Sequence, residues 1–189
     1  MAIPSHSVRA LGVIAFAATA LGAARVADAE VVVDFGVSST RVEANLASQA
    51  STVDTSSAGA HLGAGVRRAL RAGSIGVRLE LDDVDSDALL SVRALDYRRH
   101  LSQRFAITGF LGAARLGLAT PAFGYYFGGG FEIKHLLRSL DLGIDLRLGD
   151  KIARDSVLPT DPVPQGGQND NFYDLTGVSL YLRYRFGSE

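Results

Sequence analysis

The stretch that most constrains the fold of this sequence is the last one, residues 175–186, in which apolar and polar side chains alternate. Because successive side chains of a β-strand point to opposite faces, the alternation predicts a strand with one apolar and one basic face. The apolar face carries Val178, Leu180, Leu182, Tyr184 and Phe186, and the basic face carries Gly177, Ser179, Tyr181, Arg183 and Arg185. Such a strand suits either a soluble sheet or the wall of a transmembrane β-barrel.

The beginning of the chain has the pattern of a secretory signal peptide over residues 1–29. Arg9 gives a positive start, residues 10–24 are almost wholly apolar, and Ala27-Asp28-Ala29 matches an A-x-A cleavage site. We therefore expect a mature chain that begins at Glu30, with residues 30–189 as the barrel domain. The apolar segment has about 15 residues, fewer than the roughly 20 that span a bilayer as a helix, so an uncleaved anchor is the less favoured alternative.

The composition excludes several classes of protein. The sequence contains no cysteine, which excludes disulfides, thiolate metal sites and cysteine nucleophiles. Its formal net charge is −1, so nothing in the charge balance indicates a nucleic-acid partner. After the signal no apolar run approaches the length of a transmembrane helix, so a membrane location requires a closed barrel.

Alternating stretches recur along the chain and predict eight β-strands. They lie near residues 30–43, 58–70, 74–82, 88–99, 104–118, 123–134, 140–148 and 175–186. In the fourth the alternation changes phase near Ala94-Leu95, which predicts a β-bulge, whereas the fifth is ambiguous on both faces. In the seventh Ile144 is expected to face lipid, and Gly143, on the lumen side, is expected to tolerate serine.

The connections between these strands alternate in length. Those after the second, fourth and sixth strands are tight, whereas residues 44–57 and 150–173 form long polar loops and residues 83–87 a connection of intermediate length. Short periplasmic turns and longer extracellular loops are the rule for outer-membrane barrels, so we expect both chain ends in the periplasm. The fold class we predict is all-β, an eight-stranded antiparallel transmembrane β-barrel.

The signal sequence, the strand count and the closing strand resemble the small eight-stranded barrels of Gram-negative outer membranes, the OmpA/OmpX-like group. The most specific part runs from Leu180 to Phe186 and is similar to the C-terminal signal of such barrels, although three residues follow the aromatic that usually ends it. The resemblance implies an outer-membrane monomer without a cofactor, in contact with outer-membrane lipid and lipopolysaccharide. It also implies that the barrel-assembly machinery recognises Leu180, Leu182, Tyr184 and Phe186.

The polar faces of the strands are expected to meet inside the barrel. Isolated charges in a narrow lumen are costly, so we expect them to pair across it, with a proton or ion path as the alternative. The predicted lumen network consists of Arg67, Arg78, Glu80, Glu132, Asp141, Asp145, Arg147, Arg183 and Arg185, together with Asp82 and Lys134. Because side chains can fill the interior of an eight-stranded barrel, we expect no appreciable ion conductance.

No motif in the sequence predicts a catalytic, cofactor or metal site. The acidic residues at 83, 85 and 87 resemble the start of a calcium loop, but the glycine and the glutamate of such a loop are missing. The glycines at 128–130 lack the Lys-Ser/Thr of a phosphate-binding loop, and His61, His100 and His135 lack metal-ligand spacing. Barrels that deacylate lipid A use a His-x-Ser-Asn motif, and the corresponding residues 147–153 contain neither histidine nor serine.

The sequence therefore favours an outer-membrane protein with a structural or surface-interaction role through the loops 44–57 and 150–173. The first alternative is a barrel enzyme that modifies lipid A or phospholipid. The second is a soluble periplasmic barrel of lipocalin type, with apolar residues inside and charges outside. The two faces of residues 175–186 suit either orientation, so it is the similarity to an assembly signal that favours the membrane.

Overall fold

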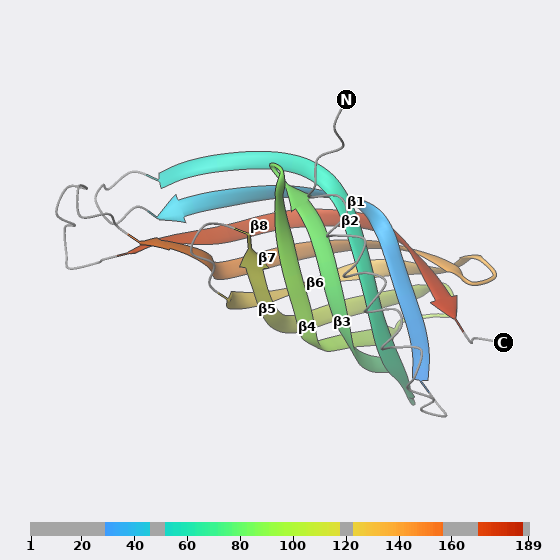
Figure 1. The fold of residues 1–189 in the computed structure, drawn as a ribbon. Coiled ribbons are helices and arrows are strands. Elements are labelled where there is room, and N and C mark those ends of the chain that lie inside the picture. The colour runs from blue at the N-terminus through green and yellow to red at the C-terminus, as the bar shows by residue number, and fades with distance from the viewer. Residues whose placement is uncertain (1–28, 46–51, 118–122, 157–169, 187–189) are drawn as a thin grey trace.

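The structure is a closed barrel of eight antiparallel strands, in which each strand pairs with the next and β8 pairs with β1 (Figure 1). It is a computed structural model and describes residues 29–45, 52–117, 123–156 and 170–186. The strands are β1 (Ala29–Asn45), β2 (Thr52–Leu70), β3 (Gly73–Val84), β4 (Asp87–His100), β5 (Phe105–Leu116), β6 (Gly124–Leu137), β7 (Leu140–Ser156) and β8 (Asp170–Phe186). The predicted fold class is confirmed. The predicted signal peptide lies, apart from Ala29, outside the described residues.

No helix long and apolar enough to cross a membrane occurs in the described segments. The wall of the barrel has an apolar outer face and a charged inner face. Large exposed side chains cover the outside, among them Phe35, Leu79, Leu111, Phe131, Ile144, Leu146 and Leu180. Inside, the same strands bury charged side chains such as Asp34, Arg78, Glu132, Asp145 and Arg183. A soluble barrel of lipocalin type requires the reverse distribution, so that alternative is excluded, and the wall has the surface of a transmembrane barrel.

A β-bulge in β4 accounts for the change of phase in its sequence. The pairing of β4 with β5 shifts register between Arg93 and Leu95, which leaves Ala94 without a partner in that register. Ala94 and Leu95 are both exposed, whereas Arg93 before the bulge and Asp96 after it are buried in the lumen. The predicted bulge is confirmed, and it turns Asp96 and Arg98 inward, where a uniform alternation would direct them toward lipid.

The connection between β3 and β4 is shorter than the sequence suggests. It is a two-residue turn at Asp85 and Ser86, whose φ angles are 51° and 72°. Two consecutive positive φ angles are those of a type I′ hairpin turn, which matches the twist of the two strands. Asp83 and Asp87 belong to the paired strand ends, so the three carboxylates lie on the tip of a tight hairpin.

Four neighbouring strands project beyond one end of the barrel (Figure 1). β7, β8 and β1 contain 17 residues each and β2 contains 19, whereas β3 to β6 contain 12 or 14. β3 pairs with β2 only from His61 onward, and β6 pairs with β7 only as far as Asp150. We call the part of these four strands beyond that pairing the projecting sheet. It consists of residues 52–60 of β2, residues 151–156 of β7, and the parts of β1 and β8 that lie between these two segments and pair with them.

The projecting sheet corrects the boundaries of both predicted loops. Of residues 44–57, those at 44–45 and 52–57 are strand, and of residues 150–173, those at 150–156 and 170–173 are strand. Residues 46–51 and 157–169 lie outside the described residues. Beyond a membrane both faces of a strand meet water, so the apolar alternation that marks a strand disappears, and a polar, Ser- and Thr-rich strand resembles a loop.

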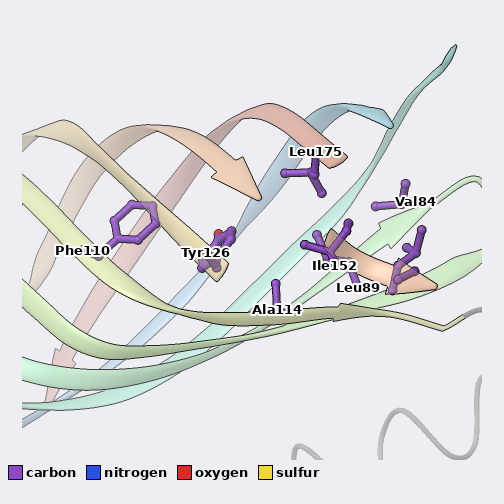
Figure 2. Packing of buried hydrophobic residues seen from close by; sticks show 9 residues of the cluster. Val84, Leu89, Phe110, Ala114, Tyr126, Ile152 and Leu175 are labelled. Carbon is purple, nitrogen blue, oxygen red and sulfur yellow. The ribbon is translucent and has the colours of Figure 1, made fainter. Parts of the chain in front are cut away.

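The interior has two layers. Toward the projecting sheet lies an apolar cluster, which Figure 2 shows in close view. It consists of Val84, Leu89, Phe110, Ala114, Leu116, Tyr126, Ile152, Ala153 and Leu175. Three of these residues come from β5, so this strand is apolar on both faces, which explains its ambiguous sequence. The rest of the lumen, toward the end with the turns at residues 71–72, 101–104 and 138–139, is charged; we call this end the turn end.

Candidate functional site

The charged residues predicted for the lumen do lie there. The buried members are Arg67, Arg78, Glu80, Asp82, Glu132, Lys134, Asp141, Asp145, Arg147 and Arg183. The side chain of Arg185 is 10% exposed at the turn end. The structure adds four charged residues that the sequence-based network lacks, Asp34, Arg93, Asp96 and Arg98. The sequence analysis could have found Asp34, because the alternation around it places it on the lumen face. The inward position of Asp96 and Arg98 follows only once the bulge is taken into account.

Arg183 of β8 occupies the centre of the network. Its Nε and Nη2 donate to the two carboxylate oxygens of Asp34 at 2.6 and 2.8 Å, which is the forked geometry that suits a guanidinium and a carboxylate. Its Nη1 donates to Glu132 of β6, which is two strands away around the barrel. All three side chains are fully buried, so this strand-to-strand contact is made in a region without water access.

Arg78 of β3 links the centre to the bulged strand. It lies 2.9 Å from Asp34 and donates to Asp96 at 2.7 Å. Arg67 of β2 donates to the same oxygen of Asp96 at 3.1 Å and lies 3.4 Å from Glu132. Asp34, Asp96 and Glu132 therefore each meet at least two guanidinium groups, which offsets much of the cost of burying them.

The next layer joins the network to the apolar cluster. Arg93 lies 2.6 Å from Glu80 and 2.7 Å from Asp145, and its guanidinium stands over the ring of Phe110 at 3.5 Å. The hydroxyl of Tyr126 donates to Glu80 at 2.9 Å. Tyr126 belongs to the apolar cluster, so the lumen passes from charge to apolar packing without an open gap between these residues.

Arg147 of β7 forms a separate set of contacts in the network. Its Nη1 donates to Asp82 at 2.6 Å, and the other oxygen of Asp82 lies 2.8 Å from Nδ1 of His61. The ring of His61 lies 5.6 Å from the ring of Tyr181, centroid to centroid. His61 and Asp82 are fully buried, so this pair faces packed side chains and no open surface.

Tyr181 also corrects the expectation for Gly143. A Cβ added at Gly143 would overlap the ring of Tyr181, which packs over it from the adjacent position on β8. Serine at this position therefore cannot be accommodated without displacing the tyrosine, and the expected tolerance is wrong. Ile144 is exposed on the outer face as expected.

The last ion pairs of the network lie at the turn end. Arg98 donates to Asp141 at 2.9 Å and lies 2.6 Å from Glu132. Arg185 lies 3.3 Å from Asp141 and 3.7 Å from Glu30. These pairs close the lumen toward the turns and leave a small cavity outside them.

The arrangement pairs charges across the lumen and does not resemble a metal site in the described residues. Within the described segments no group of three or more histidine or acidic side chains has the geometry of a metal site. The glycines 128–130 lie within β6, and His100 and His135 are exposed at the turn end. Leu180, Tyr184 and Phe186 are exposed on the outer face and Leu182 is half-buried there. Their recognition by the assembly machinery stays a prediction.

Comparison with known proteins supports the fold. No protein-family model matches the sequence, and no curated protein matches it either. Among solved structures, Ail, the attachment invasion locus protein of Yersinia pestis, aligns over 84% of this chain and 99% of its own, with 10% identity and a TM-score of 0.50. Neisserial surface protein A aligns over 82% and 97%, with 12% identity and a TM-score of 0.45. The chain has the fold of the small eight-stranded outer-membrane β-barrels.

Proposed function

We propose that this protein is a non-enzymatic surface-interaction protein of the outer membrane, and that the projecting sheet is its binding element. The mature chain begins at Glu30, the turn end faces the periplasm, and the projecting sheet stands outside among the lipopolysaccharide. The apolar outer face contacts outer-membrane lipid in a monomeric barrel. Assembly uses Leu180, Leu182, Tyr184 and Phe186 as the signal for the barrel-assembly machinery. The likeness to Ail concerns the fold alone, so the projecting sheet carries the proposal.

The observation behind this proposal is the edge of β2. Residues 52–60 pair with β1 on one side, and β3 pairs with β2 only from His61. The end of β3 at Asp83 still lies against Gly59, so the free edge is residues 52–58, Thr-Val-Asp-Thr-Ser-Ser-Ala, with one charged residue and no proline or lysine. Natural proteins usually protect an edge of this length with lysine, proline or a bulge. An unprotected edge made of small side chains is suited to a partner that adds an extended segment as a further strand.

The sheet is also held firmly enough to present that edge. Arg41 on β1 donates to Asp54 on β2 at 2.5 Å and lies 3.2 Å from Glu43 on its own strand. The register between β1 and β2 continues without a break from Asn45 to Ala29. A prearranged edge loses less conformational freedom on binding than a loop does, which favours affinity.

The enzyme alternative finds no support in the lumen. General acid–base catalysis requires a base within reach of a substrate. Among the described histidines, His61 alone has its imidazole at hydrogen-bond distance from a carboxylate, and it is enclosed by Tyr181 and Asp82 with no exposed surface. We therefore propose no reaction.

The binding edge is tested by selection of phage-displayed peptides on the protein in nanodiscs. Ser56 and Thr176 both pair with Arg41, one on the edge strand and one inside the sheet, and both are exposed. Ser56→Lys should weaken the binding of selected peptides at least tenfold, whereas Thr176→Lys should leave it within twofold. Equal binding to both variants would show that partners use another surface.

The location is tested by fractionation. The native protein should sediment with the outer membrane, resist alkaline extraction and have Glu30 as its first residue by N-terminal sequencing. Release of the protein into the soluble fraction by alkali would contradict the membrane assignment and, with it, the proposed role.

A further inference from the structure

The turn end of the barrel contains a cavity that the proposed function does not use. It has a volume of about 240 Å³, far more than the about 10–15 Å³ that a single water requires. The ends of β1, β2, β3, β4, β6 and β8 enclose it. Its lining consists of Glu30, Arg67, Ala69, Gly73, Ser74, Arg98, His100, Lys134, His135 and Arg185. We call it the vestibule.

Most of the charged side chains that line the vestibule are cationic. Four of its side chains are Arg or Lys and two are histidine, against the single carboxylate of Glu30, which lies 3.7 Å from Arg185. The other carboxylates that pair with its arginines, Asp96, Glu132 and Asp141, are fully buried and do not line the cavity. The cationic groups therefore stand between the internal carboxylates and the opening.

Two of the cations have donors to spare. Lys134 is 9% exposed and makes no ion pair within 4 Å of any acidic group in the described residues. Arg67 is 1% exposed, and its Nη1 is buried without a hydrogen-bond partner even though Nε and Nη2 are both engaged. A buried guanidinium nitrogen without an acceptor is costly, so a small shift of the Arg67 side chain that brings Nη1 to an anion in the vestibule is favoured.

The surface around the opening has the same sign. Arg71, Arg99, Arg104 and Arg138 are exposed in or beside the turns at this end. A cleft lined by charges of one sign raises the local concentration of the opposite ion, so the rim attracts anions toward the vestibule.

We propose that the vestibule is a binding site for a phosphate group. Guanidinium and ammonium donors converge there, and guanidinium groups match the oxygens of phosphate in a forked geometry. The hydroxyl of Ser74, buried and without a partner, adds a neutral donor to the wall. In the proposed orientation the vestibule faces the periplasm, where the phosphate belongs either to a soluble anion or to the headgroup of a phospholipid in the inner leaflet.

The test uses the full-length mature barrel in octyl glucoside, a detergent without phosphate, at constant ionic strength. Binding is measured by isothermal titration with inorganic phosphate in one arm and with dihexanoyl phosphatidic acid, kept below its micelle concentration, in the other. Binding of phosphate indicates a soluble ligand, and binding of the lipid alone indicates a headgroup site. Either result supports the proposal if it depends on Lys134.

Single substitutions test whether binding depends on Lys134. Lys134→Gln should weaken binding about tenfold, since a charge-assisted hydrogen bond is lost, and Lys134→Arg should restore most of it. Lys151→Gln is the same substitution at an exposed lysine of the projecting sheet, away from the vestibule, and should change affinity less than twofold. If Lys134→Gln does not fold, Ser74→Glu places a carboxylate on the wall and should abolish binding. Absence of binding in both arms, or equal binding by Lys134→Gln and Lys151→Gln, overturns the proposal.

Discussion

Replacing Arg147 by alanine isolates the contribution of a buried ion pair to this barrel. Arg147 is the only arginine within 4 Å of Asp82 among the described residues, and it also reaches the hydroxyl of Thr40 at 3.4 Å. The substitution leaves Asp82 in a lumen without water access, with His61 as its remaining partner. We therefore expect Arg147→Ala to destabilise the folded barrel.

The size of the effect follows from the burial of the pair. Both side chains are 0% exposed, and removing one partner of such a pair costs about 3–5 kcal/mol because the other charge is left uncompensated. His61 still contacts Asp82 at 2.8 Å, so we expect a loss near the lower limit, about 3 kcal/mol. Replacing both residues, Arg147→Met with Asp82→Asn, should recover about 2 kcal/mol, since no unpaired charge remains.

The assay is urea unfolding in lipid vesicles, followed by the difference in gel mobility between folded and unfolded protein. The matched control is Arg41→Ala, which removes a contact of similar length, 2.5 Å to Asp54, between side chains that are 54% and 53% exposed. An exposed pair is worth about 0–1 kcal/mol, so this variant should unfold close to the native midpoint. If Arg147→Ala lost no more stability than Arg41→Ala, the lumen would be hydrated and the buried network would not hold the barrel together.

Four further predictions follow from the same structure. Unboiled protein should migrate differently from boiled protein in a gel, since the eight strands of the barrel wall close on themselves and leave no edge there from which the wall could open; identical mobility would contradict closure. Ile144→Arg should cost about 2–4 kcal/mol in urea unfolding if Ile144 lies at the bilayer midplane, whereas Ser56→Arg, on the projecting sheet, should cost much less. Gly143→Ser should cost about 1–3 kcal/mol, and Tyr181→Ala in the same chain should remove most of that penalty; an undiminished penalty would place the clash elsewhere. The purified monomer should show no stable conducting level in a planar bilayer, because the charged layer and the apolar cluster together fill the lumen.

The sequence predicted the strands that have an apolar face toward lipid and a polar face toward the lumen. In β7 the contrast between Leu142, Ile144 and Leu146 on one face and Asp145 and Arg147 on the other leaves one orientation. Even the bulge in β4 was detectable, since a strand that changes phase without changing composition needs one extra residue. In these strands lipid on one side and the lumen on the other require apolar and polar residues to alternate, so the alternation indicates which face of the strand is which.

Other parts of the structure could not be predicted, because the sequence there shows no contrast between an apolar and a polar face. β5 is apolar on both faces, since Phe110 and Leu116 pack inside the barrel while Ile107 and Leu111 face outward. The projecting sheet is polar on its outer face, at Asp54 and Ser56 of β2 and Arg41 of β1, since water replaces lipid there. Predicting the vestibule required knowing that the ends of six strands meet, and alternation along one strand carries no information about its neighbours.

The register between strands explains the glycines, which alternation alone does not. An eight-stranded barrel has a fixed interior width, so a large side chain needs small neighbours on the strands beside it. Tyr126 lies between Gly112 and Gly149, Tyr181 between Gly36 and Gly143, and Arg147 between Gly128 and Gly177. A lumen glycine therefore marks the space taken by a large side chain on the adjacent strand. Each glycine and its large neighbour form one packing unit, and a substitution at one of them is tolerated only when the other changes with it.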